Sequence, residues 1–481
     1  MYVPTLSYSH VLFNSKIAKH LIANGHQVTM LLPLVDDNIH FNSSSINVIP
    51  SDIGIPSGLL QKQLWQNPGP FENSNPLNPY IFSKLLRVSH IFVKACQAIS
   101  DDRKLLQQLH SEQYDVGIVE QYDSCGFGIF QTLEISHVLW LSATGIFRSQ
   151  PSAFNIEYPL SYAPELFAPI SNDLTLFDRI MNVCVAGITS LVFVITQSHQ
   201  SRIFHSDLSF LSSEANSILA NTHPIFDFPV PTFDQIVPLA GISVDAEKDV
   251  TSLNEYWQTV ADSASNGFIL VSFGSIAKTI DMDSKMLATF LDSFVRFPNL
   301  LFIMKYEAAN CTLPLPTNVL TSSWIPQKSL MAHSNYKGII THGGLSSILE
   351  SLMYGKPMVL MPLFADHFKN ANIVLLRKIG LVVNKAHLTK ETLMKSILQI
   401  VSDREFTKNC QKISSMLQET RTLVSFEKQL EYRIQNSIKL SRHHFARHLR
   451  PRGQTNLLQI LESSYVSWIT MLFISSTLIY L

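Results

Sequence analysis

The chain has few charged residues and no excess of either sign. Of its 481 residues, 36 are Lys or Arg and 37 are Asp or Glu, so charged residues make up only 15%. A nucleic-acid-binding protein has a basic surface, and this balance therefore argues against that class. Hydrophobic residues reach 46% and the mean hydropathy is +0.14, which favours association with a membrane. The length allows two domains with a substantial core.

Cysteine is also scarce. The five cysteines are widely separated and form no CxxC pair: Cys96, Cys125, Cys184, Cys311 and Cys410. This spacing argues against a disulfide framework and against a zinc site, and the odd number leaves at least one free thiol.

Long apolar runs are few. The uncharged run at residues 465–481 is about 17 residues long, at the lower limit for a membrane-spanning helix. We predict a membrane anchor there, with a buried terminal helix as the alternative. A second run, residues 183–196, is too short to span a membrane and predicts a core or interfacial helix. The chain opens without the regions of a signal peptide, so we expect an N-terminally incomplete chain, or else a cytosolic protein.

The most informative stretch is residues 324–369. The apolar residues 338–341 predict a buried strand, which ends at His342, Gly343 and Gly344. Apolar residues then recur at three- and four-residue spacing, which predicts a helix with one buried face: Leu345, Ile348, Leu349, Leu352 and Met353. Two glycines before a helix let a phosphate approach free backbone N–H groups and the positive end of the helix dipole. The segment therefore predicts an anion-binding turn.

The polar residues of this stretch resemble the signature of the UDP-glycosyltransferases, the family that includes the UDP-glucuronosyltransferases. The matching positions, in the family's order and spacing, are Trp324, Pro326, Gln327, Thr341, His342, Gly343, Gly344, Ser346, Glu350, Gly355, Lys356, Pro357 and Asp366. The resemblance implies an α/β fold of the GT-B type: two Rossmann-like domains facing across a cleft, plus a C-terminal membrane helix.

The resemblance also implies a division of the chain. An acceptor-binding domain with the catalytic histidine would occupy residues 1–235, and a UDP-sugar-binding domain residues 236–425. Helices at residues 426–462 would pack back on the first domain, ahead of the anchor at 465–481. Residues 147–180, where prolines alternate with aromatic residues, would form a lid or a wall of the acceptor pocket.

The donor site implied by the resemblance is built from both ends of the matching stretch. Trp324 would stack on uracil, Gln327 would bind the base or the ribose, and Glu350 would accept both ribose hydroxyls. Asp366 would contact sugar hydroxyls. The next residue, His367, stands where many members have Gln, and in some relatives a histidine there accompanies galactose, so glucuronic acid, glucose and galactose all stay open as donor sugars. The diphosphate would be held by Ser275 of a second Gly-Ser turn and by His342, Gly344 and Ser346.

The catalytic residues come from the other half of the chain. The resemblance places His10, in the pattern Ser-x-Ser-His, where the family's catalytic base lies; a structurally satisfied histidine is the alternative. Histidine suits the role because its ordinary pKa of about 6.5 lets it accept a proton near neutral pH. The family's Asp partner is replaced by Glu120, which keeps the charge and adds a methylene group. Asp123, in the following turn, is the alternative partner.

The predicted function is inverting transfer of a hexose or glucuronic acid from a UDP-sugar to a hydroxyl of a small lipophilic acceptor, without a cofactor or metal ion. Two alternatives stay open. One is a catalytically impaired UDP-sugar-binding protein, because of Glu120 and the incomplete first strand. The other is a UDP-sugar epimerase on the same fold, which would need no acceptor.

The expected surroundings follow from the same resemblance. The protein would lie at the endoplasmic reticulum membrane with its catalytic domains in the lumen, where the sequons at Asn42 and Asn310 could be glycosylated. Its partners would be a UDP-sugar, an acceptor and the membrane, with no nucleic acid. A homo-oligomer is compatible with the family.

Overall fold

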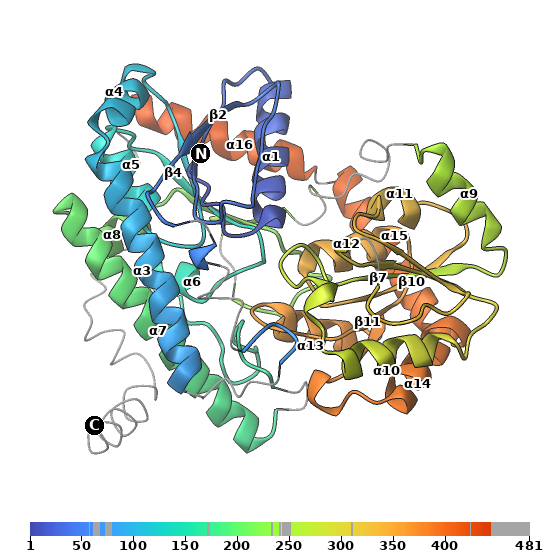
Figure 1. Ribbon diagram of the computed structural model, residues 1–481. Coiled ribbons are helices and arrows are strands. Elements are labelled where there is room, and N and C mark those ends of the chain that lie inside the picture. The colour runs from blue at the N-terminus through green and yellow to red at the C-terminus, as the bar shows by residue number, and fades with distance from the viewer. Residues whose placement is uncertain are drawn as a thin grey trace, which may run out of the picture.

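The computed structural model contains two α/β domains side by side (Figure 1). It describes residues 1–443 except 57, 61–67, 73–78, 155, 171–173, 232–233, 240–241, 243–251, 309–310 and 424. The predicted anchor at residues 465–481, most of the 426–462 segment beyond residue 443, and the sequon asparagine at position 310 lie outside the described residues.

The N-terminal domain is built on a parallel sheet whose inner strands are buried on both faces, as continuous apolar runs such as residues 139–141 require. Residues 1–3 lie in its centre: Tyr2 N donates to Ile118 O at 2.8 Å, and Val3 N donates to Leu31 O at 3.0 Å. They thus stand between two pieces of the sheet, whose strands are β1 (Thr29–Pro33), β2 (Asn47–Ser51), β3 (Gly117–Glu120), β4 (Val138–Ser142), β5 (Ser217–Ala220) and β6 (Ile236–Pro238).

The C-terminal domain repeats this plan in a second parallel sheet, in the order β12-β11-β10-β7-β8-β9. The chain reverses its direction of winding between β7 and β10, just as it does beside residues 1–3 in the first sheet. Doubly wound sheets bind ligands at the carboxyl ends of the strands at such a reversal. The strands are β7 (Phe268–Ser272), β8 (Leu301–Lys305), β9 (Val319–Ser322), β10 (Tyr336–Thr341), β11 (Met358–Leu360) and β12 (Gly380–Val382).

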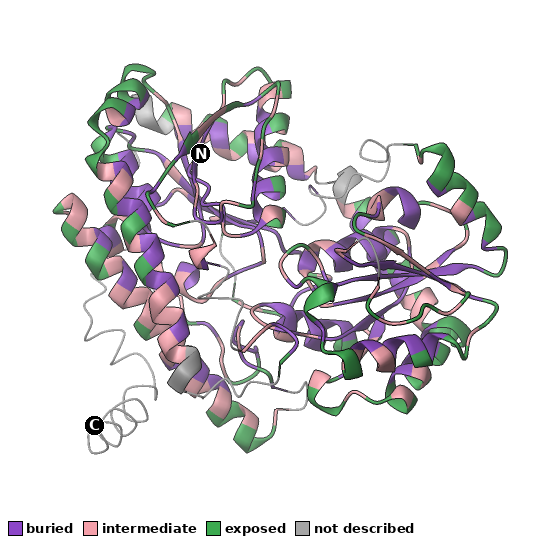
Figure 2. Ribbon diagram, viewed as in Figure 1, coloured by how far each residue is buried: buried purple, intermediate pink, exposed green. Residues whose placement is uncertain are grey.

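Helices cover both faces of each sheet, and Figure 2 shows purple strands between helices whose outer sides are green or pink. Those of the N-terminal domain are α1 (Tyr8–Ala23), α3 (Pro79–Asp101), α4 (Arg103–Ser111), α5 (Cys125–Thr132), α6 (Ser149–Ala153), α7 (Leu176–Phe204) and α8 (Leu208–Ser213). Those of the C-terminal domain are α9 (Glu255–Ser263), η1 (Thr279–Asp281), α10 (Ser284–Phe294), α11 (Gln327–Met331), α12 (Leu345–Met353), α13 (His367–Leu376), η2 (Lys385–His387), α14 (Lys390–Ser402) and α15 (Arg404–Leu423).

The helix α16 (Phe426–His443) leaves the C-terminal domain and crosses back to the first one (Figure 1). Its apolar residues Phe426, Leu430 and Ile434 pack in one cluster with residues of α1. An ion pair between His26 Nε2 and Glu431 Oε1, 2.9 Å apart, adds a polar contact at this junction. The last helix described therefore joins the two domains.

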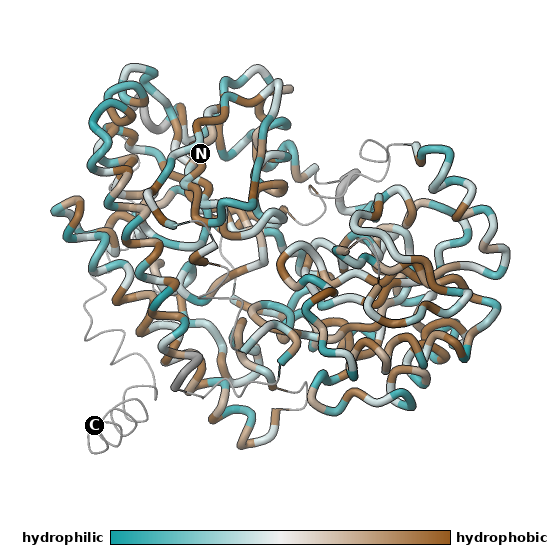
Figure 3. Tube along the Cα trace, in the orientation of Figure 1, coloured by the Kyte–Doolittle hydropathy of each residue, from teal (hydrophilic) through white to brown (hydrophobic). Residues whose placement is uncertain are grey.

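The helix α7 differs from the prediction for residues 183–196. It is 29 residues long and, by length and composition, could cross a membrane; 28% of its most apolar window is buried. The helix is longer than the apolar run on which the prediction rested, because it extends to a capping box at Thr175 and Asp178 and to a left-handed residue, His205, with φ of 50°. Figure 3 shows the hydrophobic colour running along it.

One disulfide joins Cys96 of α3 to Cys125, the first residue of α5. Both cysteines are completely buried. The argument against disulfides from cysteine spacing missed this bond, because residues far apart in the chain meet where α3 packs beside α5. Cys184, Cys311 and Cys410 are free thiols.

Candidate active site

A cavity of about 1690 Å³ lies between the two domains and is lined by both. The carboxyl ends of the two central strand pairs open onto it, as the reversal in each sheet requires. Its lining brings together residues that the sequence had placed in opposite halves: His10 from the N-terminal domain, and Ser275, His342, Gly344, Ser346, Asp366 and His367 from the C-terminal domain.

His10 and Glu120 form a buried pair at the carboxyl ends of residues 1–3 and of β3. The Nδ1 atom of His10 lies 2.9 Å from Glu120 Oε1, and the two residues are 6% and 0% exposed. Asn14, one helical turn after His10, donates to the other carboxylate oxygen, Oε2, and to the His10 carbonyl oxygen. A carboxylate held at Nδ1 leaves Nε2 as the ring nitrogen that can accept a proton.

Tyr122 is a second neighbour of His10 that sequence reasoning missed. Its ring stacks on the imidazole with centroids 4.6 Å apart and an interplanar angle of 21°. Burial, together with the nearby Glu120 and Asp366 carboxylates, raises the pKa of Tyr122 well above its ordinary value, so the phenol stays neutral. The stacking and the Glu120 contact fix the imidazole from two directions. A Tyr two residues after Glu120 is the only signal the sequence held.

Asp123, the alternative partner, makes its contacts elsewhere. Its carboxylate accepts from Gln200 Nε2 at 2.9 Å and from Tyr2 Oη at 3.4 Å. Burial raises the pKa of Asp123 to about 7, while the Gln200 amide acts in the opposite direction. The geometry therefore pairs His10 with Glu120.

The two glycine turns of the C-terminal domain enclose the His342 side chain. A Cβ atom on Gly344 would lie 2.5 Å from His342 Nε2, and one on Gly274 would lie 2.8 Å from His342 Cε1. Gly274 also has a φ of 87°, in the left-handed region. Glycine is thus required at both turns so that the imidazole can fit, as well as for backbone approach.

His342 is neutral in this position. Burial lowers its pKa to about 4, and the Lys305 ammonium contributes in the same direction. Its Nδ1 atom lies 3.0 Å from Thr341 Oγ1. The ring can therefore exchange hydrogen bonds with a ligand but adds no charge to the site.

The N-terminus of α12 faces the same cavity. Its N-cap is Gly344, which has no side chain to accept hydrogen bonds from the first-turn amides. Such amides, with the positive end of the helix dipole, favour an anion. Ser275 and Ser346 line the cavity beside this helix end, and their hydroxyl groups can donate to the same anion.

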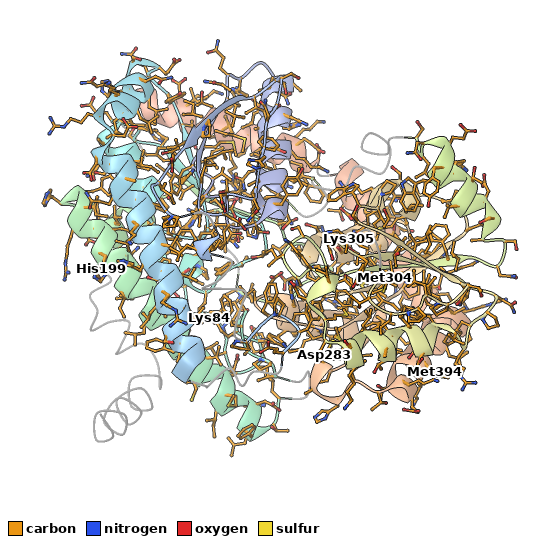
Figure 4. The ribbon with its side chains drawn as sticks, viewed as in Figure 1. Lys84, His199, Asp283, Met304, Lys305 and Met394 are labelled. Carbon is orange, nitrogen blue, oxygen red and sulfur yellow. A yellow bond between two sulfur atoms is a disulfide. The ribbon has the colours of Figure 1, made fainter. Side chains whose placement is uncertain are left out.

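The predicted nucleotide residues form a neighbouring group outside the lining of the cavity. Gln327 Nε2 donates to Glu350 Oε2 at 2.7 Å and to Ser347 Oγ, on the cavity wall, at 3.2 Å. The Trp324 ring is 64% exposed, which offers a face for stacking. Lys305, which Figure 4 labels where the C-terminal domain faces its neighbour, has its Nζ 5.5 Å from the centre of that ring.

Asp366 and His367 lie at the start of α13. Asn370 Nδ2 donates to Asp366 Oδ2 at 2.8 Å and to Gly343 O at 2.9 Å, so it ties the carboxylate to the glycine turn. The His367 ring stands almost perpendicular to that of His342, with centroids 4.5 Å apart. Burial lowers the pKa of His367, and its Nδ1 atom accepts from Phe364 N at 3.3 Å. The neutral ring therefore carries its proton on Nε2, and Asn370 is a site residue that sequence reasoning did not identify.

Burial raises the pKa of Asp366 to about 6, although His10 across the cavity opposes this. Between the ordinary value of 3.8 and about 6, the folded state holds a proton that the unfolded state has lost, so stability falls as pH rises. Asp366→Asn removes this penalty. We expect the variant to be more stable than the wild type by roughly 2–3 kcal/mol above pH 6, with the gap closing towards pH 4.

Urea unfolding of both proteins from pH 4 to pH 8 measures this gap, with Asp115→Asn at an exposed site as the control. A difference that stayed constant over this range would contradict the proposed ionisation of Asp366.

Among the residues that the structure describes, no group of three or more His, Cys, Asp and Glu side chains could hold a metal ion.

The fold and this cavity define the class of protein: a UDP-sugar-dependent glycosyltransferase with two Rossmann-like domains. The chain belongs to the family described as UDP-glucoronosyl and UDP-glucosyl transferase, whose model matches residues 1–461. The family and fold that the sequence predicted are thereby confirmed, and the chain is a UDP-glycosyltransferase.

Individual relatives are distant but cover most of the chain. UDP-glucuronosyltransferase 1A5 of Rattus norvegicus is 26% identical over 421 residues, covering 85% of this chain and 77% of its own. The 2-hydroxyacylsphingosine 1-beta-galactosyltransferase of Mus musculus is 25% identical over 438 residues, covering 86% and 75%. The structure of a variant of Os79 from O. sativa in complex with UDP matches with a TM-score of 0.63 at 13% identity, covering 91% of this chain and 99% of that one.

Proposed function

We propose that this protein transfers a sugar from a UDP-sugar to the hydroxyl of a small lipophilic acceptor, with inversion at the anomeric carbon. The observation that carries the proposal is the buried His10–Glu120 pair, 2.9 Å between Nδ1 and Oε1, which shares one cavity with the glycine turns and Asp366. A base on one wall and an anion-binding turn on the other suit a displacement across the space between them.

The proposed reaction is a single displacement. His10 Nε2 removes the proton of the acceptor hydroxyl as the acceptor oxygen forms its bond to the anomeric carbon. The bond from that carbon to the diphosphate oxygen breaks on the opposite side, and its electron pair leaves with UDP. Glu120 accepts the Nδ1–H of His10 and stabilises the imidazolium that forms. Glu120 has one methylene group more than the Asp of the family, but its carboxylate still lies within hydrogen-bond distance of the His10 ring.

The leaving group is met by the C-terminal domain. First-turn amides of α12, with the hydroxyl groups of Ser275 and Ser346, would hold the diphosphate and stabilise its growing charge. His342, being neutral, would supply a hydrogen bond. Because these groups of the chain would stabilise the charge of the leaving UDP, we propose that transfer needs no cofactor.

We assign uracil stacking to Trp324 and ribose recognition to Glu350, supported by Gln327. Glu350→Gln is then expected to raise the KM for the UDP-sugar by about 10–100-fold with little change in kcat, because a hydrogen bond to a charged group contributes roughly 1.5–3 kcal/mol. Steady-state kinetics with varied UDP-sugar measure this. The same change at exposed Glu419 on α15 is the control, and an unaltered KM at Glu350 would refute its assignment.

We propose that the donor sugar is glucuronic acid, glucose or galactose, and we assign its recognition to Asp366 and His367. The name of the mouse relative, a galactosyltransferase, supports keeping galactose among them. His367→Gln is expected to change the preferred donor, measured as the ratio of kcat/KM values over the three UDP-sugars. A ratio unchanged within twofold would mean that this residue does not select the sugar.

The acceptor would occupy the part of the cavity in the N-terminal domain. Apolar residues from the 147–170 segment and from α7 line it, among them Phe147, Leu160, Val183 and Phe193. Such a lining suits a lipophilic acceptor.

We place the protein at the endoplasmic reticulum membrane with its domains in the lumen. Three observations support this: the long apolar helix α7, the Cys96–Cys125 disulfide, which an oxidising compartment preserves, and the exposed sequon residue Asn42.

Release of UDP from a panel of UDP-sugars, with and without a mixture of phenolic acceptors, tests the proposed function. We expect release that depends on an acceptor, with the glycoside as product. Binding of a UDP-sugar without turnover in any mixture would indicate a binding protein instead. A new UDP-sugar formed without acceptor would indicate an epimerase.

A further inference from the structure

Arg148 and Glu165 form an ion pair in the wall of the acceptor side of the cavity, with side chains that are 19% and 7% exposed. Arg148 precedes α6, and Glu165 lies in the segment between α6 and α7. Both line the cavity, and their neighbours there include the apolar residues Phe147, Leu166 and Phe167. The mechanism derived above uses neither charge.

The pair is held firmly by the backbone around it. Arg148 Nη2 donates to Ala186 O of α7 at 2.7 Å. Glu165 is only 5% exposed; its backbone N donates to Asn182 Oδ1 at 2.7 Å, and its Oε1 accepts from Thr189 Oγ1 at 3.3 Å. The helix α7 therefore holds both side chains: the Ala186 carbonyl oxygen binds the Arg148 guanidinium and Thr189 binds the Glu165 carboxylate, while Asn182 fixes the backbone of Glu165.

The contact between the two side chains is an ion pair without a well-aligned hydrogen bond. Arg148 Nε and Glu165 Oε2 are 3.3 Å apart, within ion-pair distance, yet both are buried atoms without a hydrogen-bond partner. Polar atoms left in this state are costly, and a native protein usually provides a partner for them. The guanidinium has further N–H donors and the carboxylate further lone pairs. Nε and Oε2 themselves are closed to a ligand, but the two side chains are 19% and 7% exposed and line the cavity, where a ligand can reach their remaining donors and lone pairs.

The sum of the charges decides which group fits. A carboxylate would be attracted by Arg148 but would meet the Glu165 charge at nearly the same distance, and like charges that close disfavour binding. A neutral hydroxyl group satisfies both, because its oxygen accepts from the guanidinium and its O–H donates to the carboxylate.

We propose that the Arg148–Glu165 pair is an acceptor-recognition site, which binds a second, neutral hydroxyl group on an apolar acceptor and discriminates against acceptors that carry a carboxylate there. This proposal rests on the proposed function. It assigns to the acceptor an amphiphilic character: one hydroxyl at His10, an apolar body along the cavity, and another hydroxyl at the pair.

The test uses two series of phenols that share the reacting group. One series carries a terminal hydroxyl on an alkyl chain and the other a terminal carboxylate, and the chain length is varied within each series. Plain 4-alkylphenols serve as the reference. For the best chain length we expect the wild type to have a kcat/KM at least tenfold higher for the hydroxyl than for the carboxylate compound.

Glu165→Gln leaves the Arg148 charge uncompensated while keeping the size of the side chain. We expect kcat/KM for the carboxylate series to rise at least tenfold relative to the 4-alkylphenols. Glu157→Gln removes the same charge from an exposed residue of the same cavity and is expected to leave the ratio within twofold. A ratio that moves equally in both variants would reduce the effect to the general charge of the cavity and overturn the proposal.

A competition experiment with the wild type tests the proposal without any variant, so that misfolding cannot affect the result. Alkyl chains bearing a phenyl ring without the reacting hydroxyl, and ending in either an alcohol or a carboxylate, compete with a 4-alkylphenol acceptor. We expect the alcohols to inhibit at concentrations at least tenfold lower than the acids, and equal inhibition would overturn the proposal. If no phenol of any kind is glycosylated by the wild type, it is the proposed function that fails.

Discussion

Replacing His10 by Asn is expected to lower kcat by about 10³-fold and to leave the KM for the UDP-sugar nearly unchanged. A positioned general base contributes roughly 10²–10⁴-fold to a transfer of this kind, and the proposed donor residues belong to the C-terminal domain. The side chain of Asn keeps a polar group of similar reach without a proton acceptor of comparable strength. UDP release under saturating acceptor measures the loss.

Substitutions of Glu120, the partner of His10, are expected to lower kcat to different degrees. Glu120→Gln removes the charge that stabilises the imidazolium, and we expect a kcat loss approaching that of the His10 variant. Glu120→Asp keeps the charge but withdraws it by one methylene group from a contact of 2.9 Å, so its loss is expected to be smaller.

Asp123→Asn is the matched control, because the Asp123 carboxylate contacts Gln200 and Tyr2 instead of His10. A larger loss of kcat in the Asp123 variant than in Glu120→Gln would assign the partnership to Asp123. A His10→Asn variant with wild-type kcat would exclude His10 as the base.

Replacing Lys369 by Met is expected to destabilise the protein by about 3–5 kcal/mol, the usual loss when a buried ion pair loses one member. Lys369 of α13 is 2% exposed, and its Nζ lies 3.0 Å from Oδ1 of Asp227, a residue of the N-terminal domain that is 8% exposed. Burial alone would lower the pKa of Lys369, yet the Asp227 carboxylate raises it above the ordinary lysine range.

The raised pKa fixes how this loss depends on pH. A raised lysine pKa contributes stability that is complete below the unfolded value of about 10.4 and is lost only as pH rises through the folded value. The difference between wild type and variant should therefore be constant from pH 5 to pH 9, as far as Lys369 is concerned. Urea unfolding and the thermal midpoint measure it.

Two variants sharpen the test. Lys378→Met removes an ion pair with Glu405 just after the same helix, but there the side chains are 70% and 60% exposed, so we expect a loss below about 1 kcal/mol. The double variant Lys369→Met with Asp227→Asn removes both charges and should recover part of the stability. Equal losses in the Lys369 and Lys378 variants would contradict a buried pair that joins the domains.

The same substitution should also reduce kcat. The helix α13 begins with His367 and follows Asp366 directly, and it is held to the N-terminal domain by this ion pair and by Asn372, which donates to Ile170 O at 2.7 Å. Loosening α13 is therefore expected to move Asp366 and His367, the proposed donor-sugar residues, relative to His10. A folded Lys369→Met protein with wild-type kcat would show that this ion pair is not needed to position Asp366 and His367.

The sequence by itself determined the fold class and the family, and it predicted the anion-binding turn. These were readable because a parallel sheet requires continuous apolar strands, and because the residues of the glycine turn and of α12 are neighbours in the chain. Periodicity and short-range spacing carry such information. Spacing did not predict the disulfide, because the bond between Cys96 and Cys125 depends on two helices that meet only in the folded domain.

Tertiary structure alone decided the rest. It placed His10 against Glu120 rather than Asp123, added Asn14 and Tyr122 around the imidazole, and brought Asp366 to the opposite wall of the same cavity. It also joined Arg148 to Glu165 and Lys369 to Asp227. The physical reason is that the direction of a side chain at the end of a strand, and the packing of one domain against another, are set by contacts between residues far apart in the chain, which no local pattern records.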